Sequence, residues 1–453
     1  MSGSAGAGVV AAWHEALTPA LAAESWGWLA EQLASRGLMF GDRPLCTVLR
    51  PRFLTTAEHR LLRERIPLLL SAFGSVHAAA LADPGVMAQL RPEPWEEELA
   101  RADRSVAAVG ASPLGRIDAF FDPDDGQLKV TEYNAETPAG AAYNDALTEL
   151  FLGLPAMAPV LRRFDIRSLP ARPASFHAVL DAWHRFSGGR TRPVIAILDW
   201  PDVPTWSEFL LWQAWLEAMG HPCVVADVRS AEYRDGALWA GGKRIDVVYK
   251  RVLINELIER EGMQHPLVRA VRDGAVCLVN PFACKLLHKK ASLAVLSDER
   301  NAPLFNDAER EAIDRHIPWT RVVEERHTGF HGAQVDLVPH LLAARERMVL
   351  KPNDDYGGAG IVLGWEVDDA GWEAAVTRAM LEPHIVQERI SLPSEPFPSM
   401  DGDTLVFANR IVDTAPFVHG GIHVDGCMSR ISSAALVNVT AGGGSSVPTF
   451  VAG

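Results

Sequence analysis

The sequence predicts a multidomain protein of mixed α/β and α+β class, with a helical N-terminal region and a small parallel sheet in its middle third. At 453 residues the chain is long enough for several domains. Strand-like and helix-like segments alternate between residues 190 and 283, which is typical of βαβ units. Two more strand-like segments, RIDAFF and LKVTEYN, flank a turn rich in Asp, Pro and Gly, which predicts an antiparallel hairpin outside that sheet.

The elements can be assigned in order along the chain. Residues 1–105 are expected to be mostly helical, because apolar residues recur at helical spacing in WHEALTPALAAESWGWLAEQLA and AEHRLLRERIPLLLSAF. Residues 106–165 hold the predicted hairpin and then a helix that begins near Ala141 and ends before Pro155. These residues therefore form a unit distinct from the parallel sheet that follows.

The parallel sheet is predicted from three segments within residues 190–283. RPVIAILDW is expected to be a buried strand, SEFLLWQAWLEAMG a helix that ends at Gly220, and HPCVVADV a second strand. We expect the tryptophans in this part of the chain to pack in the core rather than to form an aromatic platform for a ligand. They are Trp200, Trp206, Trp212 and Trp215. Two proline-containing segments, residues 170–176 and 392–403, are expected to be connections rather than regular elements.

Composition favours a soluble cytoplasmic protein. The formal net charge of −14 argues against nucleic acid as a partner, because phosphate binding requires a basic surface. We find no run of about eighteen apolar residues, so no membrane partner is expected, and the N-terminus lacks the basic start of a signal peptide. Five scattered cysteines fit a reducing compartment and match neither a disulfide framework nor a zinc site.

The predicted hairpin places two carboxylates opposite each other. Pairing centred near Asp125 sets Asp118 against Glu132 and Arg116 against Asn134, all on one face, because strand side chains alternate. Opposed carboxylates repel by roughly 4 kcal/mol at about 4 Å and an effective dielectric near 20, so neutralising one is expected to stabilise the ligand-free protein. A hard cation such as Mg²⁺ shared with phosphates also removes this repulsion. The alternative is a solvated hairpin face whose charges point at water.

A second motif lies near residue 350. The apolar run MVLKP delivers Lys351 to a loop that contains Gly357, Gly358 and Gly360, and IVLGWEV is expected to form the next strand. Glycines let backbone N–H groups approach phosphate oxygens, and a lysine adds a positive charge. The loop lacks the GK[ST] ending of a Walker A loop and does not open a helix as a GxGxxG fingerprint does. The motif predicts a phosphate-binding loop, and the alternative is an ordinary hairpin turn.

Two further segments end in polar residues that suit ligand binding. The apolar strand HIVQERI contains Gln387 and Glu388, placed to offer backbone groups to an adenine and a carboxylate to ribose hydroxyls. The strand DVVYKR ends at Arg251. This arginine is either an exposed strand end or a group that binds an acidic substrate at the carboxyl edge of the sheet.

Together these motifs resemble those of the circularly permuted ATP-grasp proteins, the group that includes the glutathionylspermidine synthetase module. EYNAETP is similar to that module's metal-binding strand, and NPFACKLLHKKASLAVLSDE resembles the segment that carries its first ATP lysine. VLKPNDDYGGAGIVLG is similar to the second-lysine and glycine-loop segment, and CMSRISSAALVNVTAGGGSSVPTFV to the arginine strand and the glycine-rich end. In ordinary ATP-grasp ligases the phosphate-binding loop precedes the metal site along the sequence, whereas in this chain the order is reversed.

The resemblance implies a circularly permuted ATP-grasp core. Residues 106–165 would hold its metal-binding strands, residues 190–283 a small substrate domain of the pre-ATP-grasp type, and residues 284–453 the lid subdomain and the remainder of the core. It also implies that Val451 lies close to the residues just before Arg116, where unpermuted relatives continue their chain. The amidase domain of the bifunctional enzymes is missing, so no amide-hydrolysing activity is expected.

The resemblance further implies an ATP-dependent carboxylate–amine ligase that acts through an acyl phosphate and releases ADP and phosphate. Its substrates would be small-molecule or peptide carboxylates and amines, and its cofactors ATP and Mg²⁺. Alternatives are a nucleotide-binding partner protein without catalysis and a kinase that phosphorylates without ligation. The implied roles are Mg²⁺ binding by Asp118, Glu132 and Asn134, nucleotide binding by Lys290, Lys351, Gly357, Gly358, Gly360, Gln387 and Glu388, and stabilisation of the transferring phosphoryl group by Arg116 and Arg430. The family usually has one lysine where this chain has Lys289 and Lys290, which leaves both open as the first ATP lysine.

Overall fold

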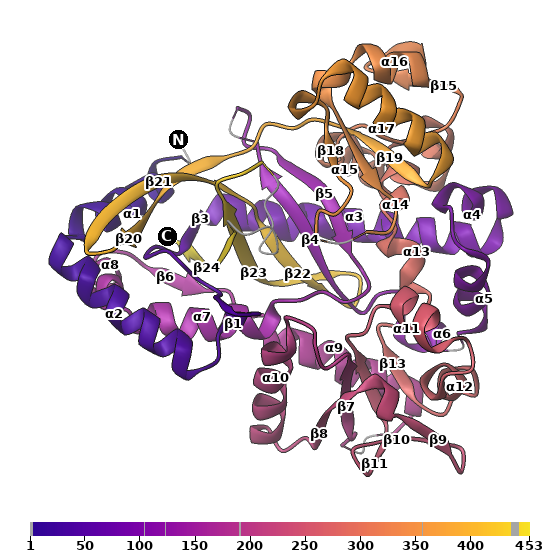
Figure 1. Ribbon diagram of the computed structural model, residues 1–453, viewed down its shortest axis with the longest axis horizontal. Coiled ribbons are helices and arrows are strands. Elements are labelled where there is room, and N and C mark those ends of the chain that lie inside the picture. Colours follow the sequence, from indigo (N-terminus) through magenta and orange to yellow (C-terminus); the bar gives the residue numbers. More distant parts are fainter. Residues whose placement is uncertain (1–2, 104, 123, 190–191, 356, 436–443) are drawn as a thin grey trace.

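A nine-stranded sheet forms the centre of the molecule, with a small α/β domain and a four-stranded lid on either side of one end (Figure 1). The computed structural model describes residues 3–453 except residues 104, 123, 190–191, 356 and 436–443. The central path runs β20-β21-β23-β22-β4-β5, and β24 joins β23 to β3 and β6. The strands are β3 Arg52–Thr55, β4 Leu114–Phe121, β5 Leu128–Asn134, β6 Ile166–Ser168, β20 Ser394–Asp401, β21 Thr404–Val412, β22 Ala415–His419, β23 His423–Ser432 and β24 Ser445–Ala452.

The residues before β4 are mainly helical. The side chain of Thr18 caps the N-terminus of the second helix, where Pro19 occupies the first turn, and Thr55 and Glu58 form a capping box on the third. These caps divide the predicted amphipathic runs into separate helices. The helices are α1 Gly3–Ala16, α2 Pro19–Ser35, α3 Thr56–Ala82, α4 Pro84–Leu90, α5 Pro94–Ala102 and α6 Val106–Val109.

Helix α3 is the longest of these and runs behind the β4–β5 hairpin (Figure 1). By length and composition it is apolar enough to cross a membrane, with a mean hydropathy of 1.4 over its most apolar window. Its residues Ile66 and Phe73 belong instead to a buried core cluster that includes Ile117 and Val130 of the hairpin. Because strand side chains alternate, this core takes one face of the hairpin and leaves Asp118 on the other.

The predicted parallel sheet is present, in the order β13-β12-β7-β8 with every pair parallel. Trp200 and Trp212 are both 3% exposed and belong to its core, as predicted. The expectation that residues 170–176 form a connection is wrong, because α9 begins at Arg172 with Pro173 in its first turn, where a missing N–H costs nothing. The elements are α7 Ala141–Gly153, α9 Arg172–Ser187, β7 Ile195–Asp199, α10 Trp206–Ala218, β8 Cys223–Asp227, β12 Val247–Lys250, α11 Ile254–Glu261, α12 Pro266–Arg272 and β13 Cys277–Val279.

The lid, residues 320–388, is built on an antiparallel sheet in the order β14-β19-β17-β18. The expected strand IVLGWEV is reduced to two residues. At Gly364 the chain turns into a single 3₁₀ turn, and a Cβ there would lie 2.0 Å from the carbonyl oxygen of Arg345. The elements are β14 Thr320–Val322, α16 Leu337–Ala343, β17 Met348–Pro352, β18 Val362–Leu363, α17 Asp369–Leu381 and β19 His384–Glu388.

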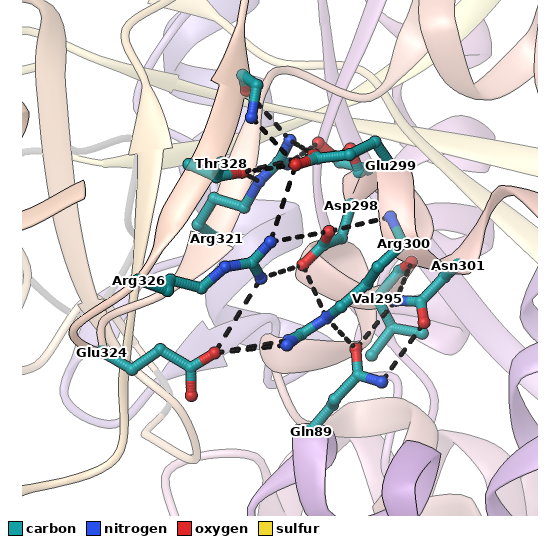
Figure 2. A network of polar contacts seen from close by, with 12 residues as sticks. Gln89, Val295, Asp298, Glu299, Arg300, Asn301, Arg321, Glu324, Arg326 and Thr328 are labelled. Carbon is teal, nitrogen blue, oxygen red and sulfur yellow. Dashed lines mark hydrogen bonds and ion pairs between the residues drawn. The ribbon is translucent and has the colours of Figure 1, made fainter. Parts of the chain in front are cut away.

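A polar network joins the lid to the preceding helical segment (Figure 2). Asp298 accepts hydrogen bonds from Arg326 of the lid, and Glu299 accepts one of 2.6 Å from Arg321. Glu324 of the lid pairs at 2.6 Å with Arg91, which follows helix α4. These contacts tie the lid to the 3₁₀ helix Glu299–Leu304 and to the end of α4. Charged side chains therefore hold the lid against these two helical segments.

Two expectations about the C-terminal part need correction. Residues 392–403 include strand β20 instead of forming a connection, and its two prolines are tolerated because β20 lies at the edge of the sheet. Val451 pairs with Leu54 and Arg167, and strands β23 and β22 separate its strand from β4. Within the described ranges the structure therefore has no direct strand pairing between Val451 and the residues just before Arg116.

Candidate active site

A cavity between the lid sheet and the central sheet brings together most of the predicted site residues. It holds about 930 Å³ of empty space, part of it open to solvent. Apolar side chains such as Phe120, Ile361 and Trp365 line part of its wall. The predicted residues that line it are Asp118, Glu132, Lys290, Lys351, Gly357, Gly358, Gln387, Glu388 and Arg430. Arg116, Asn134 and Gly360 are not in the cavity wall.

The register predicted for the hairpin is confirmed at the site. Arg116 pairs with Asn134 and Asp118 with Glu132. Beyond Asp118 the register shifts, which leaves Thr131 as a bulge. The backbone carbonyl of Thr131 accepts a hydrogen bond of 3.2 Å from Lys351 Nζ. The bulge therefore turns a backbone acceptor of the hairpin toward the lysine of the glycine loop.

The two opposed carboxylates are each compensated by cations. Arg116 donates to both oxygens of Asp118, at 2.7 and 3.0 Å, and Arg430 adds a bond of 2.7 Å. Burial raises the pKa of the Asp118 carboxyl, but the two guanidinium groups more than offset this and hold it well below its usual range. Lys290 pairs with Glu132 at 2.8 Å and, against the effect of burial, lowers the pKa of that carboxyl too. The like-charge repulsion expected from the sequence is thus outweighed.

The donor set fits a magnesium ion that arrives with a polyphosphate. Carboxylate and amide oxygens are hard ligands, and Mg²⁺ is usually held by one or two carboxylates plus substrate phosphates. The side-chain amide nitrogen of Asn134 is buried without a hydrogen-bond partner among the described residues. Among the described residues, no group of three or more His, Cys, Asp or Glu side chains is arranged so that it could hold a metal ion by itself. In the part of the chain that the structure describes, the charged side chains of the cavity wall are four cations, Lys290, Lys351, Arg389 and Arg430, and three anions, Asp118, Glu132 and Glu388, a balance that favours a polyanion.

The adjacent lysines point to different places. Lys290 Nζ contacts Glu132 at 2.8 Å and the carbonyl oxygen of Asp355 at 2.6 Å, so it spans from the hairpin to the glycine loop at the cavity wall. Lys289 Nζ contacts Glu96 at 2.8 Å and Asp354 at 3.0 Å in a buried ion-pair cluster. The geometry places Lys290 at the cavity and Lys289 behind it.

Lys290→Ala is expected to reduce ATP turnover by roughly 100-fold or more, the usual loss when a group that stabilises transition-state charge is removed. Lys289→Ala should retain the nucleotide site but lower the melting temperature, because it leaves Glu96 and Asp354 without this partner. Measurements of ADP release and of thermal unfolding on both variants separate the two effects. Loss of turnover in Lys289→Ala beside a normal Lys290→Ala enzyme would reverse the assignment.

Lys351 has no carboxylate within ion-pair distance among the described residues. Its Nζ donates to the Gln387 side-chain oxygen at 2.7 Å and to the carbonyl of Thr131. Burial lowers the pKa of the Lys351 ammonium to about 8. A bound phosphate would supply the missing negative charge and raise this pKa.

Nucleotide binding is therefore expected to be accompanied by proton uptake at alkaline pH. Above pH 8 the free Lys351 is mostly neutral, whereas the phosphate-bound lysine is protonated, so affinity should fall as pH rises through about 8. Calorimetry at pH 8.5 in two buffers of different ionisation enthalpy should detect an uptake of about half a proton or more. Lys351→Met should remove this uptake; the same uptake in Lys351→Met would assign it to another group.

The glycine loop has the backbone that its composition predicts. Gly357, Gly358 and Gly360 have φ values of 66°, 78° and 69°, a region that favours glycine. A Cβ on Gly360 would lie 2.6 Å from the Pro352 ring. Tyr356 of this loop lies outside the described residues. The close approach to Pro352 therefore requires glycine at position 360, which lies outside the cavity wall, whereas Gly357 and Gly358 line the cavity.

Strand β19 contributes a positioning side chain and a charged group. Gln387 is 2% exposed, accepts a hydrogen bond from Lys351 and donates one of 3.0 Å to Thr320, so its side chain holds the lysine. Glu388 is bound by His331 and, at 2.6 Å, by Arg347. The sequence predicted nucleotide contacts for both residues; in the structure both line the cavity, and the Gln387 side chain is committed to Lys351.

Comparison with solved structures decides the fold. A glutathione synthetase-like effector from Globodera pallida, in its apo form, aligns with a TM-score of 0.63 over 96% of this chain and 98% of its own, at 13% sequence identity. The chain therefore shares the fold of this glutathione synthetase-like effector. At this identity the likeness concerns the fold alone.

Sequence comparison adds relatives of modest similarity. A protein of Frankia alni named "Putative glutamate--cysteine ligase 2-3" is 27% identical over 345 residues, which cover 71% of this chain and 36% of the relative. A Frankia casuarinae protein named "Putative glutamate--cysteine ligase 2-2" is 27% identical over 466 aligned positions, which cover 95% of this chain and 50% of the relative. No protein-family model matches the sequence. The chain thus spans half or less of the length of these curated relatives.

Other residues of this chain have contacts that the sequence did not indicate. Arg251 is 6% exposed and donates to the carbonyl of Pro138 at 2.6 Å, so the interpretation as an exposed strand end is wrong. It clamps the loop that follows the hairpin strand β5. Asp413, which has no recognisable motif around it, binds Arg430. The contact between Arg251 and Pro138 joins residues 113 positions apart, a separation that local patterns do not encode.

Proposed function

We propose that the chain is an ATP-dependent carboxylate–amine ligase that forms an amide or peptide-like bond through an acyl-phosphate intermediate. The observation that carries this proposal is the cavity in which the Asp118–Glu132 pair of the hairpin faces Lys290, Lys351 and Arg430 from much later parts of the chain. The ATP-grasp fold and the ligase names of the curated relatives support it.

The residues of the cavity suit phosphoryl transfer to a carboxylate. Lys290, Lys351 and the backbone N–H groups of the glycine loop would bind the nucleotide phosphates. Asp118, Glu132 and Asn134 would hold Mg²⁺, which when bound supplies charge neutralisation to the phosphates. The substrate carboxylate attacks the γ-phosphorus and ADP leaves. The amine then attacks the acyl carbon of the mixed anhydride, and inorganic phosphate leaves.

The arginines have different expected roles. Arg430 lines the cavity and would stabilise the negative charge that develops on the transferring phosphoryl group. Arg116 is 8% exposed and lies behind Asp118, which it grips through both oxygens, so it would orient that carboxylate. The lid would exclude water from an intermediate that hydrolyses readily.

We further infer a circularly permuted ATP-grasp order. The strands that carry Asp118 and Glu132 precede the lid in the chain, although both face the same cavity. Strand β24, which follows the lid in the chain, is also a buried part of the central sheet. Both features match the order that the sequence motifs imply.

An assay of ATP consumption against a panel of acids, with and without amines, tests the proposal. Glutamate and cysteine are the first pair, because of the names of the relatives. A ligase should release ADP and phosphate only with both partners and yield a product whose mass is their sum less water. Transfer of ¹⁸O from a labelled acid to phosphate would demonstrate the acyl phosphate. ADP release with an acid alone, giving a stable phosphorylated product, indicates a kinase, and nucleotide binding without turnover across the panel indicates a non-catalytic partner.

A further inference from the structure

The connection between β21 and β22 consists of two residues, Asp413 and Thr414, and is buried beneath the cavity. Asp413 is 0% exposed. Its backbone N–H donates to the carbonyl of Arg430 at 3.0 Å, and its carboxylate accepts from the backbone N–H and from Nε of Arg430, the latter at 2.6 Å. Thr414 exchanges two backbone hydrogen bonds, of 2.8 and 3.1 Å, with Ala119, the residue after Asp118. The connection thus holds the two strands that carry Asp118 and Arg430.

Arg430 is shared between two carboxylates with different access. Its Nη2 contacts Asp413 at 2.6 Å and Asp118 at 2.7 Å. Asp118 lines the cavity, whereas Asp413 is not in the cavity wall and is fully buried. Asp118 can therefore meet a nucleotide-bound ion, and Asp413 acts only through the residues it touches.

We propose that Asp413 is a positioning residue that keeps Arg430 directed at the reacting phosphoryl group when Asp118 turns to the metal–nucleotide complex. This inference rests on the function proposed above. An ion that binds Asp118 competes with Arg430 for that carboxylate, which is one of the two acceptors of the arginine. The other acceptor fixes both the backbone and Nε of the arginine, so the guanidinium keeps its orientation. A charge held in place beforehand needs no reorganisation during the reaction.

The first test is structural and needs no turnover. In ¹⁵N-labelled protein, the Nε–H of Arg430, assigned by its loss in Arg430→Lys, should be protected from exchange with solvent. Asp413→Asn should remove that protection, whereas Asp118→Asn, which takes away one of the two partners of Nη2 and none of Nε, should keep it. Unchanged protection in a folded Asp413→Asn protein would overturn the proposal.

The second test is a double-mutant cycle on the ligase reaction. Asp413→Asn should lower kcat by about 10- to 100-fold and change the Kd of a non-hydrolysable Mg–nucleotide by less than about threefold. In the Arg430→Lys background the same substitution should lower kcat by less than about twofold, because the group it positions is gone. An equal loss of kcat in both backgrounds would show a general structural role and overturn the proposal.

A matched variant covers failure to fold. Asp413→Glu keeps the charge but moves it by one methylene, and it replaces Asp413→Asn in both tests if the asparagine variant does not fold. Partial protection of the Arg430 Nε–H and an intermediate kcat are then expected, and wild-type protection together with wild-type kcat would contradict the role. If the wild-type chain turns over no ATP with any acid, the proposed function fails, and the exchange measurement alone still decides whether Asp413 holds Arg430.

Discussion

Asp118→Asn is expected to abolish ATP turnover and to lower the melting temperature of the ligand-free protein. Asp118 lines the cavity and would be one of the Mg²⁺ ligands, so loss of its charge should reduce turnover by roughly 1000-fold or more. In the ligand-free protein the same carboxylate separates the guanidinium groups of Arg116 and Arg430. Removing one partner of a buried ion pair costs about 3–5 kcal/mol, so the apo protein should be destabilised.

The sign of the stability change distinguishes two physical descriptions. If repulsion between Asp118 and Glu132 dominated, as the sequence alone suggests, neutralisation would raise the melting temperature. The three cations paired with these carboxylates predict the opposite. Asp125→Asn, on the exposed turn of the same hairpin, is the matched control and should change neither quantity. Full activity in the Asp118→Asn, Glu132→Gln double variant would refute the metal assignment.

The parts of the site that could be predicted follow from local rules. Alternation along two strands and the turn chemistry between them set Asp118 against Glu132, and the structure has that pairing. The glycines of the loop are recognisable because their positive φ values exclude most other residues. The parallel sheet followed from the alternation of buried strands and helices. The hairpin register and the loop backbone depend on residues near one another in the sequence, and the parallel sheet was predicted from two neighbouring strands and the helix between them.

The parts that could not be predicted depend on distant contacts. Arg430 reaches Asp118 from 312 residues away, and Lys351 reaches the carbonyl of Thr131 from 220. Such pairings decide whether the carboxylates repel or are held, and no local pattern encodes them. The prolines of β20 are compatible with a strand only because that strand lies at the sheet edge. The structure differs from the expectations at these places because they depend on where an element lies in the tertiary structure, which its composition does not determine.

Truncation of the C-terminus is expected to destroy nucleotide binding, although the removed strand contributes no residue to the cavity wall. A cut after Asn438 falls outside the described residues, but it removes all of β24. That strand pairs with β23, where Ser446 lies opposite Arg430, and also with β3 and β6. Its apolar residues Val447, Phe450 and Val451 are each 0% exposed.

The energetic argument makes this a large effect. Burying three such side chains contributes about 5–9 kcal/mol, which is comparable to the 5–15 kcal/mol that stabilises a typical domain. The loss also removes the neighbour that holds the Arg430 strand beside β22, so the guanidinium should lose its place at the cavity. Binding of Mg–ATP, followed by calorimetry together with circular dichroism, should vanish in the truncated chain and persist when only the exposed Gly453 is removed. Normal Mg–ATP affinity after loss of β24 would mean that the strand is not part of the nucleotide-binding core, and that the permuted ATP-grasp interpretation is wrong.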